Sequence, residues 1–136
     1  MKLLRSILSV VASYIVVFGI VLLSDPVLER LFPTQYVAGK VPPLFLLWVT
    51  TAIYFVASIL GGWLCARLAP ARPGRHLVAL FILGELLGAA STIANWGKWP
   101  HWHALLWMGL WPLCLWIGGR LGRLKEREHL AEARTS

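Results

Sequence analysis

Four apolar segments, each about as long as a lipid bilayer is thick, constrain this chain more than any other feature. They span residues 3–23, 44–68, 76–95 and 103–120. A helix needs roughly 20 residues to cross a hydrocarbon core of about 30 Å. Helices are expected because an unpaired backbone amide is costly in lipid, and no segment alternates in the manner of a membrane strand. The sequence therefore predicts an all-α integral membrane protein, built as a bundle of four transmembrane helices.

Composition leaves little of the chain for anything else. Of the 136 residues, 58% are hydrophobic and only 14% are charged, which is far from the balance of a soluble domain. There is no linker, so residues 1–136 are predicted to form one membrane domain that ends in a basic tail over 121–136. Pro112 interrupts the fourth segment and would remove one backbone hydrogen bond, so a kink is expected there rather than a break.

The basic residues at the segment ends predict the orientation. Ten of the 13 Lys and Arg residues fall on one side of the predicted membrane: Lys2, Arg5, Arg67, Arg72, Arg75, Arg120, Arg123, Lys125, Arg127 and Arg134. Only Arg30, Lys40 and Lys98 fall on the other side. Because basic loops are retained in the cytoplasm, both termini are predicted to be cytoplasmic. Orientation and contact with anionic lipid explain the net charge of +7 without nucleic acid.

The first external loop, residues 24–43, carries a helix signal of its own. Asp25 and Pro26 are of the types preferred at a helix cap and at the first helical position. Leu28 and Leu31 supply an apolar face, and Pro33 ends the pattern. We therefore expect a short helix lying at the membrane interface within this loop.

The second external loop is rich in tryptophan and histidine. Trp96, Trp99 and Trp102 stand at a helix boundary, as in the aromatic belts at membrane surfaces. His101 and His103 invite a metal site, but residues two apart point in different directions on a helix, and neither an acid nor a cysteine is nearby. We predict an interfacial aromatic belt, with no metal and no other cofactor.

The third segment carries Glu85 near its middle. On a helical wheel Gly84, Gly88, Ser91 and Asn95 fall on one narrow face, and Glu85 lies on its edge. Such faces let helices approach closely, so we expect Glu85 at a helix contact rather than in lipid, where a charged carboxylate costs about 3 kcal/mol or more. Glycines near the inner ends of the second and fourth segments are the other predicted packing positions: Gly61, Gly62, Gly118 and Gly122.

Hydroxyl groups of the first two segments are predicted to lie at the depth of Glu85, namely those of Ser13, Tyr14, Tyr54 and Ser58. One interpretation is structural: a protonated Glu85 donates a hydrogen bond to one of these hydroxyls or to a backbone carbonyl. The other interpretation is functional, because an acid inside a membrane is a candidate site by default. In that hypothesis Glu85 exchanges a proton for a cation or an amphipathic substrate.

With four helices and one membrane carboxylate, the chain resembles the small multidrug transporters in size and architecture. Those proteins carry their carboxylate in the first helix, whereas the first segment here has none. Their dimers tolerate opposite insertion, against which the ten-to-three charge bias argues. No residue role is carried over from that family.

The remaining candidates carry weaker signals. Trp107 and Trp111 share a stripe of the fourth segment that suits helix packing, lipid, a partner helix, or a quinone or pigment ring. Cys65 and Cys114 lie 49 positions apart in different segments and are interpreted as small packing residues. The sequence contains no catalytic triad, phosphate-binding loop or paired catalytic carboxylates, so an enzyme has little support.

The first functional expectation is therefore a binding or scaffold component that acts through helix contacts in the bilayer. It would be an accessory subunit of a larger membrane complex or a homo-oligomer. The alternative is a small proton-coupled transporter that uses Glu85. The arrangement resembles that of many small bacterial inner-membrane proteins, and we expect that localisation.

Overall fold

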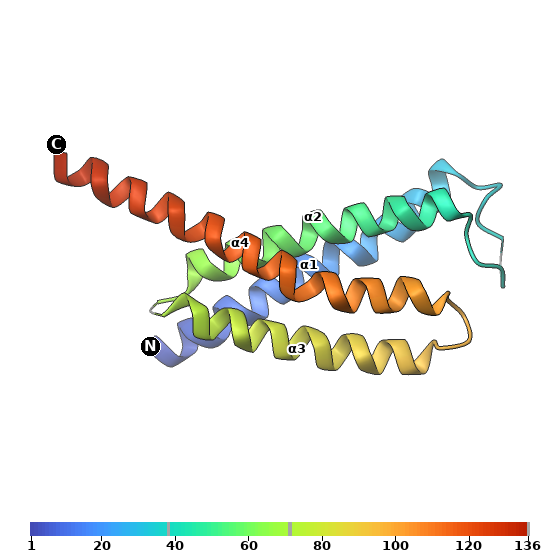
Figure 1. Cartoon of the computed structure of the whole chain (residues 1–136), viewed down its shortest axis with the longest axis horizontal. Coiled ribbons are helices and arrows are strands. Elements are labelled where there is room, and N and C mark those ends of the chain that lie inside the picture. The colour runs from blue at the N-terminus through green and yellow to red at the C-terminus, as the bar shows by residue number, and fades with distance from the viewer. Residues whose placement is uncertain (38, 71, 136) are drawn as a thin grey trace.

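The computed structural model describes residues 1–37, 39–70 and 72–135, without the side chains of residues 125 and 126. It contains four helices: α1 (Lys2–Leu31), α2 (Leu44–Leu68), α3 (Pro73–Ala94) and α4 (His101–Thr135). The described part of the chain contains no strand. Each helix is long and apolar enough to cross a membrane, which confirms the all-helical fold with four candidate membrane spans (Figure 1).

The helix bounds follow the predicted segments closely in the middle of the chain. α2 begins directly after Pro43 and has the predicted bounds. α3 begins earlier than predicted, with Pro73 at its first position, because a proline fits the first turn of a helix without losing a hydrogen bond. α4 passes through Pro112 as one unbroken helix and continues to Thr135, so residues 121–135 of the predicted basic tail belong to this helix.

The described residues of the first loop form no separate short helix, and that prediction was wrong. Residues 25–31 instead continue α1, which passes through Pro26, and the amide of Phe32 donates to the carbonyl oxygen of Leu28 at 2.8 Å. Leu28 is buried, and the ring of Phe32 meets that of Phe45 edge-on at 5.7 Å. These contacts hold the last turns of α1 against the start of α2, which offsets the hydrogen bond lost at the proline.

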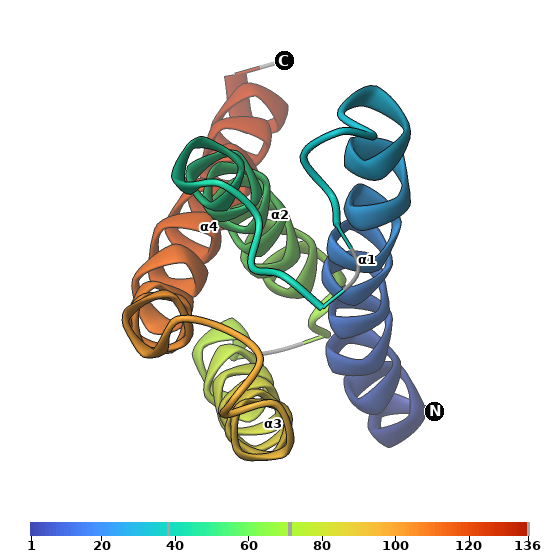
Figure 2. The same ribbon diagram turned by 90° about the vertical axis from the view of Figure 1, so that its right-hand side faces the viewer.

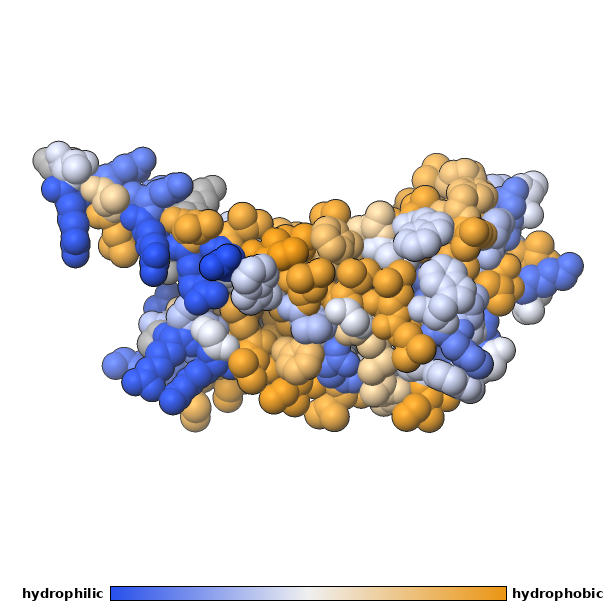
Figure 3. All heavy atoms as spheres, in the orientation of Figure 1, coloured by the Kyte–Doolittle hydropathy of each residue, from blue (hydrophilic) through white to orange (hydrophobic). Residues whose placement is uncertain are grey.

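The two ends of the bundle differ. The N-terminus, the turn between α2 and α3 and the tail of α4 gather at one end, called here the terminal end, and the other two connections lie at the opposite end (Figure 1). α2 and α4 therefore run parallel to each other and antiparallel to α1 and α3. An apolar band covers the middle of the molecule, and hydrophilic side chains gather at the terminal end and along the tail of α4 (Figure 3).

α4 packs most extensively against α2, and glycines allow the two backbones to touch. A Cβ atom on Gly62 would lie 2.8 Å from the carbonyl oxygen of Leu115, and one on Gly122 would lie 3.0 Å from that of Trp63. One on Gly118 would lie 2.8 Å from the amide nitrogen of Trp63. Only a glycine fits at such distances, so these three positions set the separation of α2 and α4.

The contact between α1 and α2 also depends on a glycine. A side chain at Gly61 would overlap that of Val17, which is buried in the core of the bundle together with Ala57 and Cys65. Ser13 is fully buried in the same contact, and its hydroxyl donates to the carbonyl oxygen of Ser9 at 2.6 Å. Small side chains thus bring α1 as close to α2 as the glycines bring α4.

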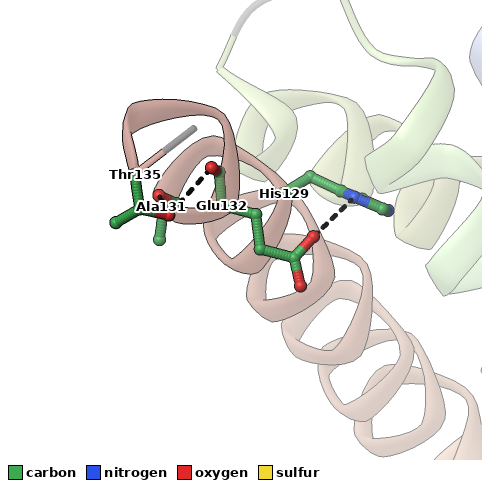
Figure 4. Close-up of polar contacts among 4 residues, drawn as sticks. All are labelled: His129, Ala131, Glu132 and Thr135. Atoms are coloured by element: carbon green, nitrogen blue, oxygen red, sulfur yellow. Dashed lines mark hydrogen bonds and ion pairs between the residues drawn. The ribbon is translucent and has the colours of Figure 1, made fainter.

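The tail of α4 leaves the bundle and makes its polar contacts within itself. The Nδ1 atom of His129 lies 3.8 Å from a carboxylate oxygen of Glu132, and both side chains are exposed. The hydroxyl of Thr135 donates to the carbonyl oxygens of Ala131, at 3.4 Å, and Glu132, at 2.9 Å (Figure 4). Contacts of this kind stabilise an exposed helix by only a few tenths of a kcal/mol each.

Candidate functional site

A cavity of about 600 Å³ lies among the four helices in the half of the bundle away from the terminal end. All four helices contribute to its wall, and so does the connection between α3 and α4. Its polar and aromatic lining residues are Tyr14, Phe18, Asp25, Thr50, Tyr54, Glu85, Ser91, Thr92, Asn95, Trp96, Trp99, His101, His103, Trp107 and Trp111. Viewed from that end, α3 stands apart from α1 and from α2 (Figure 2).

Glu85 lies near the middle of α3, and its half-buried side chain lines this cavity. Its carboxyl group forms no hydrogen bond or ion pair with any described residue. Asp25 on α1 is the second carboxylate of the wall, and none of the described lining residues is a lysine or an arginine. The cavity thus holds two carboxyl groups and two histidines but no lysine or arginine among its described lining residues, and a cation entering it would replace some of the hydration that a carboxylate loses in a membrane.

Trp111 on α4 holds the turn of α3 that carries Glu85. Its indole Nε1 donates to the carbonyl oxygen of Phe81 at 3.2 Å, and in a helix that carbonyl also accepts from the amide of Glu85. The indole ring lies directly on Gly84, where a Cβ atom would overlap it. Gly84 and Trp111 therefore fix the depth and direction of Glu85 relative to α4.

Stacked aromatic rings form the wall that faces Glu85. Tyr54 on α2 and Trp107 on α4 are nearly parallel, with 4.4 Å between their ring centroids and 5° between their planes. The indole of Trp107 donates to the hydroxyl of Thr51 at 3.1 Å, which fixes its orientation. Trp111 continues this surface, 6.3 Å from Tyr54. Such rings present broad apolar faces that also attract cations.

His103 supplies a polar group that the bundle leaves without a partner. It is 6% exposed, and its Nε2 atom has no hydrogen-bond partner among the described residues. Trp99 and Trp107 flank its ring at 6.0 and 4.9 Å. A buried nitrogen without a partner is costly.

The predicted partners of Glu85 fall into two groups. Tyr14 and Tyr54 line the cavity with it, as do Gly88, Ser91 and Asn95 of its own helix. Ser13 and Ser58 lie instead in the contact between α1 and α2, and the hydroxyl of Ser58 donates to the carbonyl oxygen of Tyr54 at 2.6 Å. Neither serine lines the cavity, and both hydroxyls donate to carbonyl oxygens of their own helices.

The packing face predicted for α3 is divided between a contact and the cavity. Gly84 is covered by Trp111, whereas a Cβ atom on Gly88 would meet nothing within 4 Å. Further along, the side-chain amide of Asn95 donates to the carbonyl oxygen of Ser91 at 2.9 Å. The small residues beyond Gly84 thus widen the cavity and do not admit another helix.

The three tryptophans predicted as an interfacial belt are partly exposed, and two of them, Trp96 and Trp99, line the cavity. Trp96 stacks on His101 with 3.9 Å between the ring centroids, and Trp102 lies 5.7 Å from Trp48. Trp99 lines the cavity itself. No described lining residue comes from the terminal end, where Leu77 of α3 packs directly on Gly119 of α4.

Sequence reasoning missed the role of His103 and left that of the tryptophans open. His103, Trp107 and Trp111 are spaced four apart, so they share one face of α4, and the structure turns that face inward. Extending the tryptophan stripe by one turn to His103 would have marked the face as one that carries a polar group. That signal favours a bundle interior over lipid.

Comparison with protein-family models, curated proteins and solved structures found no match. The chemistry of the cavity therefore rests on its own residues. Two carboxyl groups and a wall of aromatic rings suit a ligand that is partly apolar and positively charged.

Proposed function

We propose that this protein binds a small amphipathic cation inside the membrane, in the cavity beside Glu85. The observation that carries the proposal is the position of Glu85 on the wall of a cavity to which all four helices contribute and whose described lining lacks lysine and arginine. At about 600 Å³ the cavity has the size of an ordinary small-molecule site. A cation beside an aromatic face gains about 0.5–2 kcal/mol, in addition to its attraction to the carboxylate.

Proton-coupled transport is the form of this activity that we propose first. Glu85 would release its proton when the cation binds, and the cation would leave when the proton returns. The cavity reaches the connection between α3 and α4, and none of its described lining residues comes from the terminal end, which supports entry from the tryptophan side. The ten-to-three distribution of basic residues supports cytoplasmic termini, in the inner membrane of a bacterium, so that side would be external.

The binding experiment uses tetraphenylphosphonium as the probe and tetraphenylborate, an anion of the same shape, as its control. Isothermal titration of the detergent-solubilised chain should detect saturable binding of the cation alone. Because protons compete with the cation for Glu85, the affinity should fall as the pH is lowered. Equal affinity for both ions would overturn the proposal.

Two variants and one control locate the site. Glu85→Gln removes the charge at constant size and should weaken binding by about tenfold or more, which corresponds to about 1.4 kcal/mol. Gly88→Leu should abolish binding by filling the cavity, since nothing lies within 4 Å of a Cβ atom there. Gly109→Leu is the matched control, because that glycine is also open but is exposed outside the cavity lining. Uptake into proteoliposomes by Glu85→Gln at the unmodified rate would eliminate proton coupling.

An accessory or scaffold role is the second candidate, and the exposure of α3 supports it. Leu80 is the one fully buried residue of α3, all of whose residues the structure describes, while Leu86 and Ile93 are 65% and 75% exposed. The exposed apolar surface of α3 could be covered by lipid, and equally by a second membrane protein or another copy of the chain. Purification in mild detergent should then yield a stoichiometric partner or a defined oligomer. A monomer that binds tetraphenylphosphonium would exclude this role.

Cysteine labelling tests the proposed orientation. The variants Thr34→Cys and Ala131→Cys place an exposed thiol at opposite ends of the bundle. A membrane-impermeant maleimide applied to intact bacterial cells should label the first and spare the second. The reverse pattern would place the termini outside and contradict the proposal.

A further inference from the structure

A groove of about 750 Å³ runs between the start of α1 and the start of α3 at the terminal end, separate from the Glu85 cavity. Basic residues line its rim and apolar residues line its floor. The lining residues are Lys2, Leu3, Ser6, Ile7, Val10, Val11, Pro70, Arg72, Arg75, His76 and Ala79. We propose that this groove binds one anionic phospholipid, with its phosphate among the basic side chains and an acyl chain along the floor.

The charge of the rim is one-sided. Lys2, Arg72 and Arg75 are exposed, and none of them forms an ion pair with a described residue. No carboxylate is among the described residues that line the groove. A basic pocket between membrane helices is the arrangement that attracts anionic headgroups, at about 1 kcal/mol for each Lys or Arg near the surface.

The start of α3 adds to the positive potential at the same place. Arg72 precedes the helix in a left-handed conformation, with φ at 49°, and no side chain caps the helix. The first turn contains no acidic residue, so the positive end of the helix dipole is not neutralised there. The N-terminal end of α3 alone would attract any anion. The apolar floor of the groove is the feature that favours a lipid over a free anion.

The floor extends from the rim toward the middle of the bundle along α1. Val11 stands nine residues after Lys2, which at 1.5 Å per residue is about 13 Å deeper. Leu3 and Ile7 between them are 75% and 54% exposed in the groove. An acyl chain lying there would cover these side chains while its phosphate stayed at the rim, whereas free phosphate would leave them bare.

A hydrogen-bonded histidine fixes the width of the groove. The hydroxyl of Ser6 on α1 is hydrogen-bonded to Nε2 of His76 on α3. The other ring nitrogen, Nδ1, lies 3.2 Å from the carbonyl oxygen of Arg72. His76 thereby ties the two walls together beside the basic rim, so the site is formed before a lipid arrives.

Native mass spectrometry of the full chain in detergent tests the proposal, with phosphatidylglycerol and phosphatidylcholine of identical acyl chains as probes. The unmodified chain should retain one phosphatidylglycerol and no phosphatidylcholine. The double variant Arg72→Gln/Arg75→Gln should weaken phosphatidylglycerol binding by about thirtyfold, from two cations of about 1 kcal/mol each. The control Arg127→Gln/Arg134→Gln lowers the net charge of +7 by the same two units, on the tail of α4, and should leave binding within about twofold.

A third variant separates a lipid from a free anion. Ile7→Gln changes the exposed floor without changing charge, so it should weaken phosphatidylglycerol binding and leave binding of inorganic phosphate unchanged. Circular dichroism should show the helix content of the unmodified chain in every variant. Equal retention of the two lipids, equal losses in the two double variants, or full displacement of the lipid by inorganic phosphate would overturn the assignment. None of these outcomes depends on the Glu85 cavity.

Discussion

Replacing Gly62 by alanine should destabilise the bundle, because the added methyl group meets backbone atoms. It would lie 2.8 Å from the carbonyl oxygen of Leu115 and 3.0 Å from its Cα atom, whereas ordinary contact begins at 3.4 Å. Neither atom can rotate away, so α2 and α4 must separate locally by roughly half an ångström, and overpacking of this kind costs about 1–3 kcal/mol.

The matched control is Gly109→Ala. Gly109 lies on α4 as well, and a Cβ atom there would meet nothing within 4 Å. Alanine favours a helix over glycine by about 0.5–1 kcal/mol at either position, so the comparison of the two variants removes that gain from the result. The difference in unfolding free energy between them should therefore equal the full packing cost of about 1–3 kcal/mol.

The assay is a titration of dodecylmaltoside micelles with sodium dodecyl sulfate, followed by the fluorescence of the eight tryptophans. Gly62→Ala should unfold at a lower fraction of sodium dodecyl sulfate than Gly109→Ala. Gly118→Ala should lose about 3 kcal/mol, the upper end of the expected packing cost, because its Cβ atom meets the backbone of both Ile59 and Trp63. Identical midpoints for Gly62→Ala and Gly109→Ala would refute a backbone contact between α2 and α4.

Two further outcomes follow from buried groups. Trp111→Phe removes the donor to the Phe81 carbonyl and part of the ring that covers Gly84, so it should cost about 1–3 kcal/mol in the same titration and should also weaken cation binding. Cys65 and Cys114 are fully buried, so a maleimide should label neither thiol in the folded chain and both thiols after unfolding in sodium dodecyl sulfate. If Cys114 in mild detergent reacted as fast as in the unfolded chain, α4 would not be packed as described.

The number and type of the helices could be predicted because hydrophobic length alone determines them. The bounds of α2 followed from the prolines near its two ends. The end of α1 did not, since Asp25 and Pro26 are equally suited to begin a helix or to lie within one. What decides between these is the burial of Leu28, a tertiary contact that no local pattern records.

The candidate site was predictable in its centre and not in its surroundings. An acid flanked by glycines marked Glu85, and depth along the helices grouped it with Tyr54. Depth does not fix the direction in which a helix faces, so Ser13 and Ser58 were expected beside Glu85 and lie between α1 and α2 instead. The inward face of Trp107 was likewise undetermined, because a tryptophan stripe suits lipid as well as a bundle interior.

The length of α4 has a practical consequence for anyone who labels this protein. Its 35 residues measure about 52 Å, against a hydrocarbon core of about 30 Å, so a helix that spans the core would extend about 20 Å beyond it. A fluorescent protein fused behind α4 would be held away from the lipid headgroups and from the other helices. The same fusion ahead of Lys2 would sit directly on the basic groove, where its bulk would compete with whatever binds there.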